Sequence, residues 1–230
     1  MNKTIELICI LSFVLIILTG CTGEIKKSEL SLEYKIQEEI EYIEYLIFKI
    51  SNKYAKGEYL KDDSLDWDEI LKDERKINDS LDTIVLDLSE KNVENEEILK
   101  FSNQLNNLII VSTNKNEESL LTELANLYYL LPGYFSKIND NHNEREEKEV
   151  KSLALRCFAN ANIDNWDEAT NLVNQALEKY LSLMNNVDYI ENNSYKMNKI
   201  YVLIGELKNA VDIKNIDLVK LKFVTYIENS

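Results

Sequence analysis

Apolar residues recur at alternating intervals of four and three along nearly the whole chain, and this spacing constrains the fold more than any other feature. Side chains spaced in this way share one face of an α-helix. Five glycines and one proline in 230 residues leave little material for the many turns of a sandwich or barrel. The sequence therefore predicts an all-α protein. Its most regular series is Ile36, Ile40, Ile43, Ile47, Ile50 and Tyr54.

The same spacing predicts seven further helices after this one, about eight in all. Pro132-Gly133 is expected to end the fourth of the eight, because proline interrupts helical hydrogen bonding and glycine favours helix ends. A polar run from Lys137 to Asn143 follows, and we interpret it as a domain boundary. The seven further apolar faces cover residues 70–88, 98–109, 120–131, 150–161, 169–184, 197–211 and 216–227.

A repeat of about 50 residues marks the starts of the even-numbered helices. Asp or Asn stands at each start, where its side-chain oxygen can accept an N–H that the first turn leaves unpaired. An acidic residue follows two positions later, at the positive end of the helix dipole. Regular spacing of this kind indicates duplication of a helical hairpin. The four first residues, 50, 49 and 50 positions apart, are Asp66, Asn116, Asn165 and Asn215.

Tryptophan follows the first residue only in the first and third units, as Trp67 and Trp166. We expect each to cover a joint between helices. The deeper period is therefore about 100 residues, the size of a four-helix bundle. This predicts two tandem antiparallel bundles, in residues 32–138 and 144–230. The alternative is a continuous solenoid of four helical hairpins, each packed on its neighbours.

The N-terminus has the pattern of an export signal. Lys3 precedes an apolar run from Leu7 to Leu18. This run is too short to span a hydrocarbon core of ~30 Å, which takes about 20 residues, but it matches the apolar region of a signal peptide. Residues 1–20 are therefore predicted to be a signal peptide.

The residues that close the apolar run, Leu18-Thr19-Gly20-Cys21, resemble the lipobox of bacterial lipoproteins. The resemblance implies cleavage after Gly20 and a diacylglyceryl group on Cys21. Two acyl chains give stable membrane anchoring. The mature chain is then expected on the outer face of the cell membrane, with residues 21–31 as a tether between lipid and fold.

The second half carries a further resemblance. Trp166-Asp167-Glu168-Ala169 opens a long predicted helix, Tyr180 supplies a second aromatic residue in it, and Asn215 starts the last helix. This pattern is similar to an uncharacterised helical domain family of spore-forming Gram-positive bacteria. The histidine that this family tends to carry after the Trp helix has no counterpart here. The resemblance implies a helical fold and no known activity.

The net charge of −15 disfavours binding to nucleic acid and to anionic lipid surfaces. The charge is also unevenly distributed. From Cys21 to Asp140 there are 26 acids and 14 bases, which gives −12; from Asn141 to Ser230 there are 14 and 11, which gives −3. A protein partner of the first half is therefore expected to be basic.

No pattern of catalytic or metal-binding residues stands out. His142 is the sole histidine, is expected in a solvated loop and has no nearby cysteine for a zinc site. Cys157 has the spacing of a core residue and, once residues 1–20 are removed and Cys21 is acylated, no disulfide partner. Asn139-Asp140-Asn141 lacks the glycine and distal glutamate of a calcium loop. We predict no catalytic residue, no cofactor and no metal.

The leading functional hypothesis is a non-enzymatic cell-surface lipoprotein whose helical domain binds another protein or a peptide. Its partners would be the membrane, through the lipid on Cys21, and a protein of the envelope. The alternative is a solute- or metal-binding lipoprotein associated with a transporter, which requires a ligand cleft or a cluster of metal ligands. The residues that we expect to be able to line a binding groove are Tyr42, Tyr45, Tyr129 and Tyr134.

Overall fold

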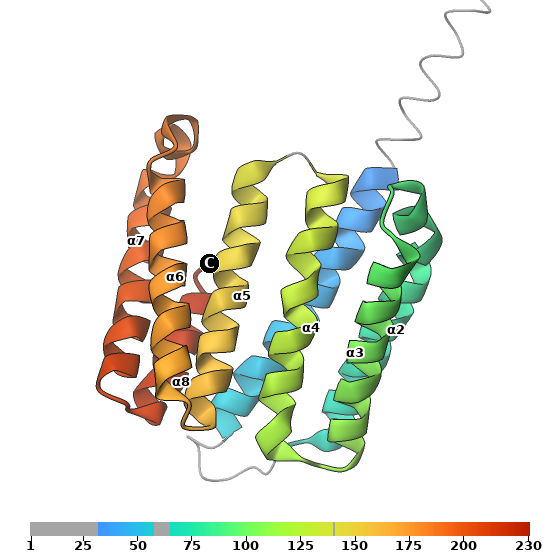
Figure 1. Cartoon of the computed structure of the whole chain (residues 1–230), viewed down its shortest axis with the longest axis horizontal. Helices are drawn as coiled ribbons and strands as arrows, with labels where there is room; N and C mark the ends of the chain where they lie inside the picture. Colours follow the sequence, from blue (N-terminus) through green and yellow to red (C-terminus); the bar gives the residue numbers. More distant parts are fainter. Residues whose placement is uncertain (1–31, 58–64, 140) are drawn as a thin grey trace, which may run out of the picture.

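The computed structural model describes residues 32–57, 65–139 and 141–230. Cys21, the signal peptide and the tether lie outside these ranges. Every regular element in the described residues is an α-helix, which confirms the all-α prediction (Figure 1). The first helix covers residues 32–57. The others are α2 (Trp67–Glu90), α3 (Asn95–Thr113), α4 (Glu117–Ile138), α5 (His142–Asn162), α6 (Trp166–Met184), α7 (Val187–Asp212) and α8 (Ile216–Ile227).

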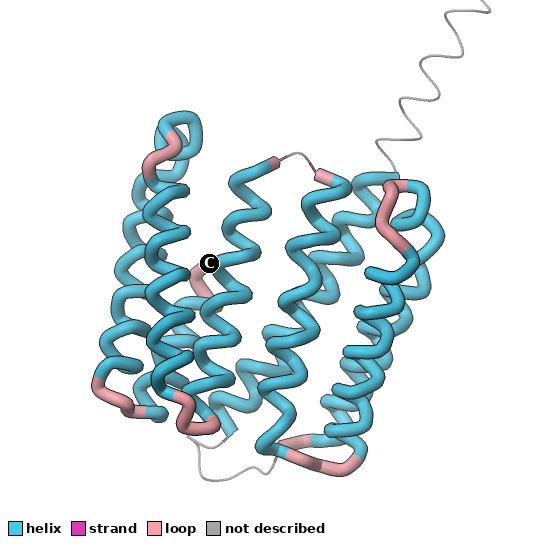
Figure 2. Tube along the Cα trace, in the orientation of Figure 1, coloured by secondary structure: helices cyan, strands magenta, loops and turns pink. Residues whose placement is uncertain are grey.

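Successive helices run in opposite directions (Figure 2), and they lie in two layers rather than in one row. Each helix from α2 onward packs against the next one in sequence, and α5 also packs against α8. In Figure 1, α3, α4, α5 and α6 stand side by side, with the first helix passing behind α4. The buried apolar side chains form one cluster that extends from Ile36 to Tyr226. The arrangement is therefore bundle-like, with one core shared by the helices of both layers.

The first helix crosses from α2 to α5. It therefore contacts both of the segments predicted to form separate bundles, 32–138 and 144–230. That each segment folds alone stays a prediction. The contacts follow the helix from its start to its end: Lys35 Nζ lies 2.8 Å from Asp87 Oδ2, the Phe48 ring 4.7 Å from that of Tyr128, and the Tyr54 ring 6.2 Å from that of Phe158.

The predicted helix starts are confirmed at all four places. Asp66, Asn116, Asn165 and Asn215 are the N-caps of α2, α4, α6 and α8. Three of the four side chains accept a hydrogen bond from the backbone N–H three residues later. The exception is Asn165, whose Nδ2 donates to Asn160 Oδ1 at 2.9 Å. The 50-residue repeat is therefore present in the capping geometry.

The turns that precede α4, α6 and α8 share one backbone conformation. Lys115, Asp164 and Lys214 have φ angles of 53°, 59° and 52°, in the left-handed region. Each of these residues donates its N–H to the carbonyl three residues earlier, and the N-cap that follows donates to the carbonyl five residues earlier. This pair of bonds is the Schellman motif, which satisfies carbonyls at the end of a helix.

The prediction that Pro132-Gly133 ends the fourth helix is wrong, because α4 continues to Ile138 with Pro132 inside it. An internal proline costs ~3 kcal/mol in a helix. Beyond it, however, Tyr134, Phe135 and Ile138 are all buried in the core. Burying large side chains stabilises by about 1.5–3 kcal/mol each, so the apolar face outweighs the proline.

The polar run after α4 forms only a short connection. Asn139 is the C-cap of α4, and Asn141 caps α5 by accepting the N–H of Glu144. His142 therefore lies in the first turn of α5 and not in a loop, although its side chain is exposed as expected. The predicted boundary is a helix–helix junction, and α4 and α5 pack against each other across it.

Cys157 is fully buried on α5, as its spacing predicted. Burial raises the pKa of its thiol to about 12, so the group is protonated and packs as an apolar side chain. Trp67 and Trp166, in the first turns of α2 and α6, are partly buried and pack against the core.

Candidate functional site

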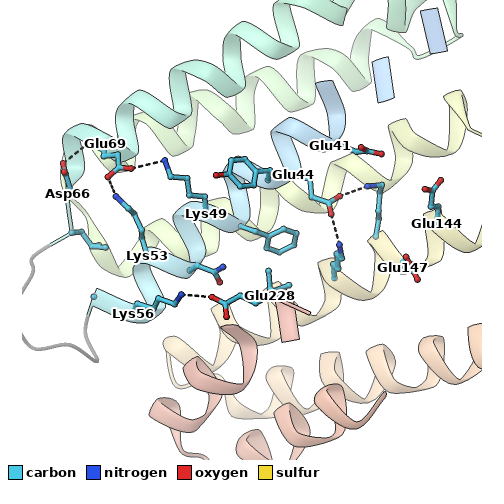
Figure 3. Close-up of a pocket in the computed structure, with 18 residues that line it drawn as sticks. Glu41, Glu44, Lys49, Lys53, Lys56, Asp66, Glu69, Glu144, Glu147 and Glu228 are labelled. Carbon is cyan, nitrogen blue, oxygen red and sulfur yellow. Dashed lines mark hydrogen bonds and ion pairs between the residues drawn. The ribbon is translucent and has the colours of Figure 1, made fainter. Parts of the chain in front are cut away.

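A groove of about 1060 Å³ lies between the first helix and the starts of α2 and α5 (Figure 3). The C-terminal residues Ile227 and Glu228 close one side of it. Segments from both halves of the sequence therefore build it. The first helix supplies one long wall with side chains at helical spacing: Glu41, Glu44, Tyr45, Phe48, Lys49, Asn52, Lys53 and Lys56.

A buried ion pair joins the two walls. Glu44 of the first helix is 8% exposed, and its two carboxylate oxygens accept bonds from Lys148 Nζ at 2.7 Å and Lys151 Nζ at 3.0 Å. Burial alone would raise the pKa of Glu44, but the charges of the two lysines outweigh it and hold the pKa below its usual value. Glu44 is therefore a carboxylate at neutral pH and fixes α5 against the first helix.

One end of the groove carries a row of lysines. Lys49 and Lys53 both pair with Glu69 at the start of α2, and Lys56 Nζ lies 2.7 Å from Glu228 Oε1 (Figure 3). These pairs are partly exposed, so each contributes little stability. They orient the lysines and hold the start of α2 and the C-terminus near the first helix.

The other end of the groove is acidic. Glu41, Glu144 and Glu147 lie there, away from the lysine row (Figure 3). Burial raises the pKa of Glu147, and the charges of nearby lysines oppose this rise. Tyr42 and Tyr45 are exposed beside this end and stack with ring centroids 6.3 Å apart. The groove lining has seven carboxylates and five lysines, a net charge of −2.

The four tyrosines expected to line a groove do not lie together. Tyr45 lines the groove described above, and Tyr42 stacks on it. Tyr129 and Tyr134 line a second cavity of about 620 Å³, formed by α3, α4, α5 and α6. Tyr134 is largely buried there and donates from its hydroxyl to the Glu97 carbonyl at 2.5 Å.

Sequence reasoning did not identify Glu44, although a signal was present. Glu44 follows Ile40 by four positions and precedes Ile47 by three, so it occupies the apolar face of the first helix. A carboxylate on such a face is buried and requires a partner. Its partners Lys148 and Lys151 are 104 and 107 residues away, and no local pattern connects them to it.

The described residues contain no group of three His, Cys, Asp or Glu side chains placed to hold a metal ion. Among the described residues, the carboxylate within ion-pair distance of the His142 ring belongs to Glu146, with 3.5 Å between Nε2 and Oε1. No helix in the described part of the chain is long and apolar enough to cross a membrane.

Comparison of the chain with models of protein families, with curated proteins and with solved structures found no match. The class of protein is therefore given by its own fold and site: an all-α arrangement of antiparallel helices with a charged groove between the first helix and the starts of α2 and α5. The lipobox resemblance at Leu18–Cys21 and the family resemblance of the second half stay predictions.

Proposed function

We propose that this protein is an exported lipoprotein, anchored by Cys21 on the outer face of the cell membrane, whose helical domain binds a basic segment of another envelope protein. The observation that carries the binding part is the groove between the first helix and α5. The anchor part rests on the lipobox-like residues Leu18–Cys21 after a short apolar run.

The charge of the groove favours a basic segment. All five of its lysines are held in ion pairs, and the carboxylates of Glu41 and Glu144 lie at one end, near the exposed rings of Tyr42 and Tyr45. Carboxylates and tyrosine faces both attract lysine and arginine side chains. The first half of the mature chain carries −12, so a basic partner would also be steered toward this side.

Site-specific photo-crosslinking in cells tests the groove. A photoreactive phenylalanine in place of Tyr45 is expected to capture a defined envelope protein. The same residue in place of Tyr195, which is 83% exposed on α7, serves as control. Replacing Glu41 and Glu144 by lysine should reduce capture from position 45. Equal capture from positions 45 and 195 would overturn the proposal. So would capture from position 45 that is unchanged by the two charge reversals.

Metabolic labelling with a clickable fatty acid tests the anchor. The wild-type chain is expected to incorporate the label and to fractionate with membranes. Cys21→Ser should abolish both, while Cys157→Ser, at a buried position, should keep both. Label that persists in Cys21→Ser refutes the anchor and leaves the groove proposal standing.

A solute-binding lipoprotein that serves a transporter is the second candidate. The observation that favours it is the size of the groove, close to the ~300–1,000 Å³ of small-molecule sites, with charged groups in its lining. A bound solute raises the stability of the native state, by about 2.7 kcal/mol at 100 times its Kd. Thermal shifts produced by a small molecule, together with no capture from position 45, would favour this candidate.

A further inference from the structure

The second cavity, on a different face of α5 from the groove, contains an arginine without an acidic partner. Residues 147, 148 and 151 of α5 face the groove, whereas 149, 152, 153 and 156 face the cavity. With 100° between successive residues, these two sets lie well apart around the helix. The cavity is therefore a separate site, and what it binds does not depend on the proposal for the groove.

Arg156 lines this cavity. Its guanidinium lies over the Tyr129 ring, 5.0 Å from the ring centroid. Among the described residues no carboxylate lies within ion-pair distance of it. Tyr129 is 59% exposed, so the pair is accessible from solvent. The stacking holds the planar guanidinium in place and leaves its edge N–H groups for a ligand.

Ser152 supplies a second polar group one turn away on the same helix. It lines the cavity and is 4% exposed, and its hydroxyl has no hydrogen-bond partner in the described part of the chain. A buried hydroxyl without a partner costs free energy, which a ligand acceptor would recover. Residues four apart on a helix have Cβ atoms about 5–6 Å from each other, so Ser152 and Arg156 are neighbours on the face of α5 that lines the cavity.

The other charged residues of the cavity are already paired. Glu97 Oε2 lies 2.7 Å from Lys137 Nζ, and Glu149 pairs with Lys179 and Arg145. The lining has three cations and two carboxylates, a net charge of +1 in a chain of −15. A ligand with one negative charge fits this balance, while a polyanion would be repelled by the surrounding acidic surface.

One part of the cavity wall is apolar and open. Leu130, Pro132 and Leu153 line the cavity beside the Tyr129 ring. Gly133 faces empty space, since a Cβ built on it meets no atom within 4 Å. These walls can cover an apolar group attached to the charged one.

We propose that this cavity binds a carboxylate attached to an apolar group, with Arg156 and Ser152 holding the carboxylate. Arginine presents a fork of donors that matches the two oxygens of a carboxylate. The carboxylate can belong to a small molecule or to the C-terminus of an apolar peptide, and the test separates these two sources.

Isothermal titration calorimetry of the full-length chain tests this proposal with four probes: 4-phenylbutyrate, N-acetyl-Leu-Phe with a free C-terminus, the same dipeptide with an amidated C-terminus, and inorganic phosphate. Binding of one or both carboxylates, but not of the amide or phosphate, is expected. Binding only of phenylbutyrate identifies a small-molecule source, and binding only of the free dipeptide identifies a peptide C-terminus. Binding of none, or equal binding of the amide or of phosphate, overturns the proposal.

Four variants test whether the probe binds in this cavity. Arg156→Gln should lower the affinity for the carboxylate probe roughly 10- to 100-fold, and Ser152→Ala should lower it several-fold. Arg75→Gln removes an exposed arginine from α2 and should change nothing. Gly133→Leu projects a side chain into the open space and should block binding, while circular dichroism checks that the helices are retained. Unchanged affinity in both Arg156→Gln and Gly133→Leu would also overturn the proposal.

Discussion

Two buried glutamates occupy equivalent positions on the apolar faces of their helices and differ in what surrounds them. Glu44 receives bonds from two lysines, and its pKa is lowered. Glu74 of α2 receives one bond from the Ser112 hydroxyl, and its Oε2 has no partner among the described residues. Burial therefore raises the pKa of Glu74 to about 7, although the bond from Ser112 opposes the rise.

Glu74→Gln is expected to stabilise the protein at alkaline pH. The native pKa lies above the ordinary value of 4.5, so the folded chain holds this proton more tightly than the unfolded chain. Ionisation of the buried Glu74 therefore destabilises the folded state. This destabilisation is absent near pH 4.5, grows toward pH 7 and is complete above it. Denaturant unfolding should show similar stabilities near pH 4.5 and a gain on the order of 3 kcal/mol for the variant at pH 8.

A matched control for this prediction is Glu90→Gln, which removes an exposed carboxylate from the same helix and the same charge from the chain. If the difference between Glu74→Gln and the wild type were the same at both pH values, the buried carboxylate would not titrate as described.

Lys214 adopts the left-handed conformation, which is strained for any residue with a Cβ, at φ 52°. Lys214→Gly is expected to raise the free energy of unfolding by about 0.5–1 kcal/mol, because glycine reaches this conformation without a clash. Lys199→Gly, at an exposed position within α7, should lower it by about 1 kcal/mol. Thermal melts of the two variants should therefore shift in opposite directions, and a shift in the same direction contradicts the argument.

At the scale of elements, the feature that repeats is mainly the backbone turn with the N-cap residue after it. The side chains along the helices match less closely. The turns before α4, α6 and α8 each place a left-handed residue before an asparagine N-cap. The cap starts the next helix in a fixed direction, so these three hairpins close in the same way. This explains why the spacing of about 50 residues persists while the surface charges of the halves differ.

Asn215→Ala is expected to destabilise the protein by about 1 kcal/mol, because the Leu218 N–H, 3.0 Å from Asn215 Oδ1, loses its acceptor. Asn215→Asp keeps an acceptor at the positive end of the helix dipole and should retain wild-type stability. Chemical denaturation measures both changes. Equal losses in the two variants would show that the side-chain cap is not what stabilises the start of α8.

At the scale of the whole molecule, the first helix connects the two predicted bundles. Its ion pair through Glu44 and its ring contact through Tyr54 both reach α5. Residues 28–138 and 144–230 are still expected to fold separately as helical pieces, because each contains complete hairpins. The first helix is then expected to make the two pieces bind each other when mixed.

Separate expression, circular dichroism and melting test whether the pieces fold. Mixing them and measuring their association by analytical ultracentrifugation tests the interface. Glu44→Gln in the first piece should weaken this association, since it leaves the buried Lys148 and the partly buried Lys151 without a carboxylate. Two disordered pieces would favour a solenoid, whose units depend on their neighbours.

Much of this architecture was predictable from local sequence. Apolar spacing predicted the helices, and Asp66, Asn116, Asn165 and Asn215 predicted where four of them begin, because periodicity and capping act within a few residues. The end of α4 was not predictable from Pro132-Gly133 alone. The cost of a proline inside the helix there competes with the free energy of burying the residues beyond it. Only the packed core decides which of the two is larger.

Tertiary structure alone decided the two sites. The lipobox-like residues that end in Cys21 are contiguous and readable in the sequence. The pairing of Glu44 with Lys148 and Lys151, and of Arg156 with Tyr129, joins residues on different helices. Such contacts depend on how the helices cross, which is set by the packing of many side chains at once. A buried charge in the sequence indicates that a partner exists, and only the assembled helices show which residue it is.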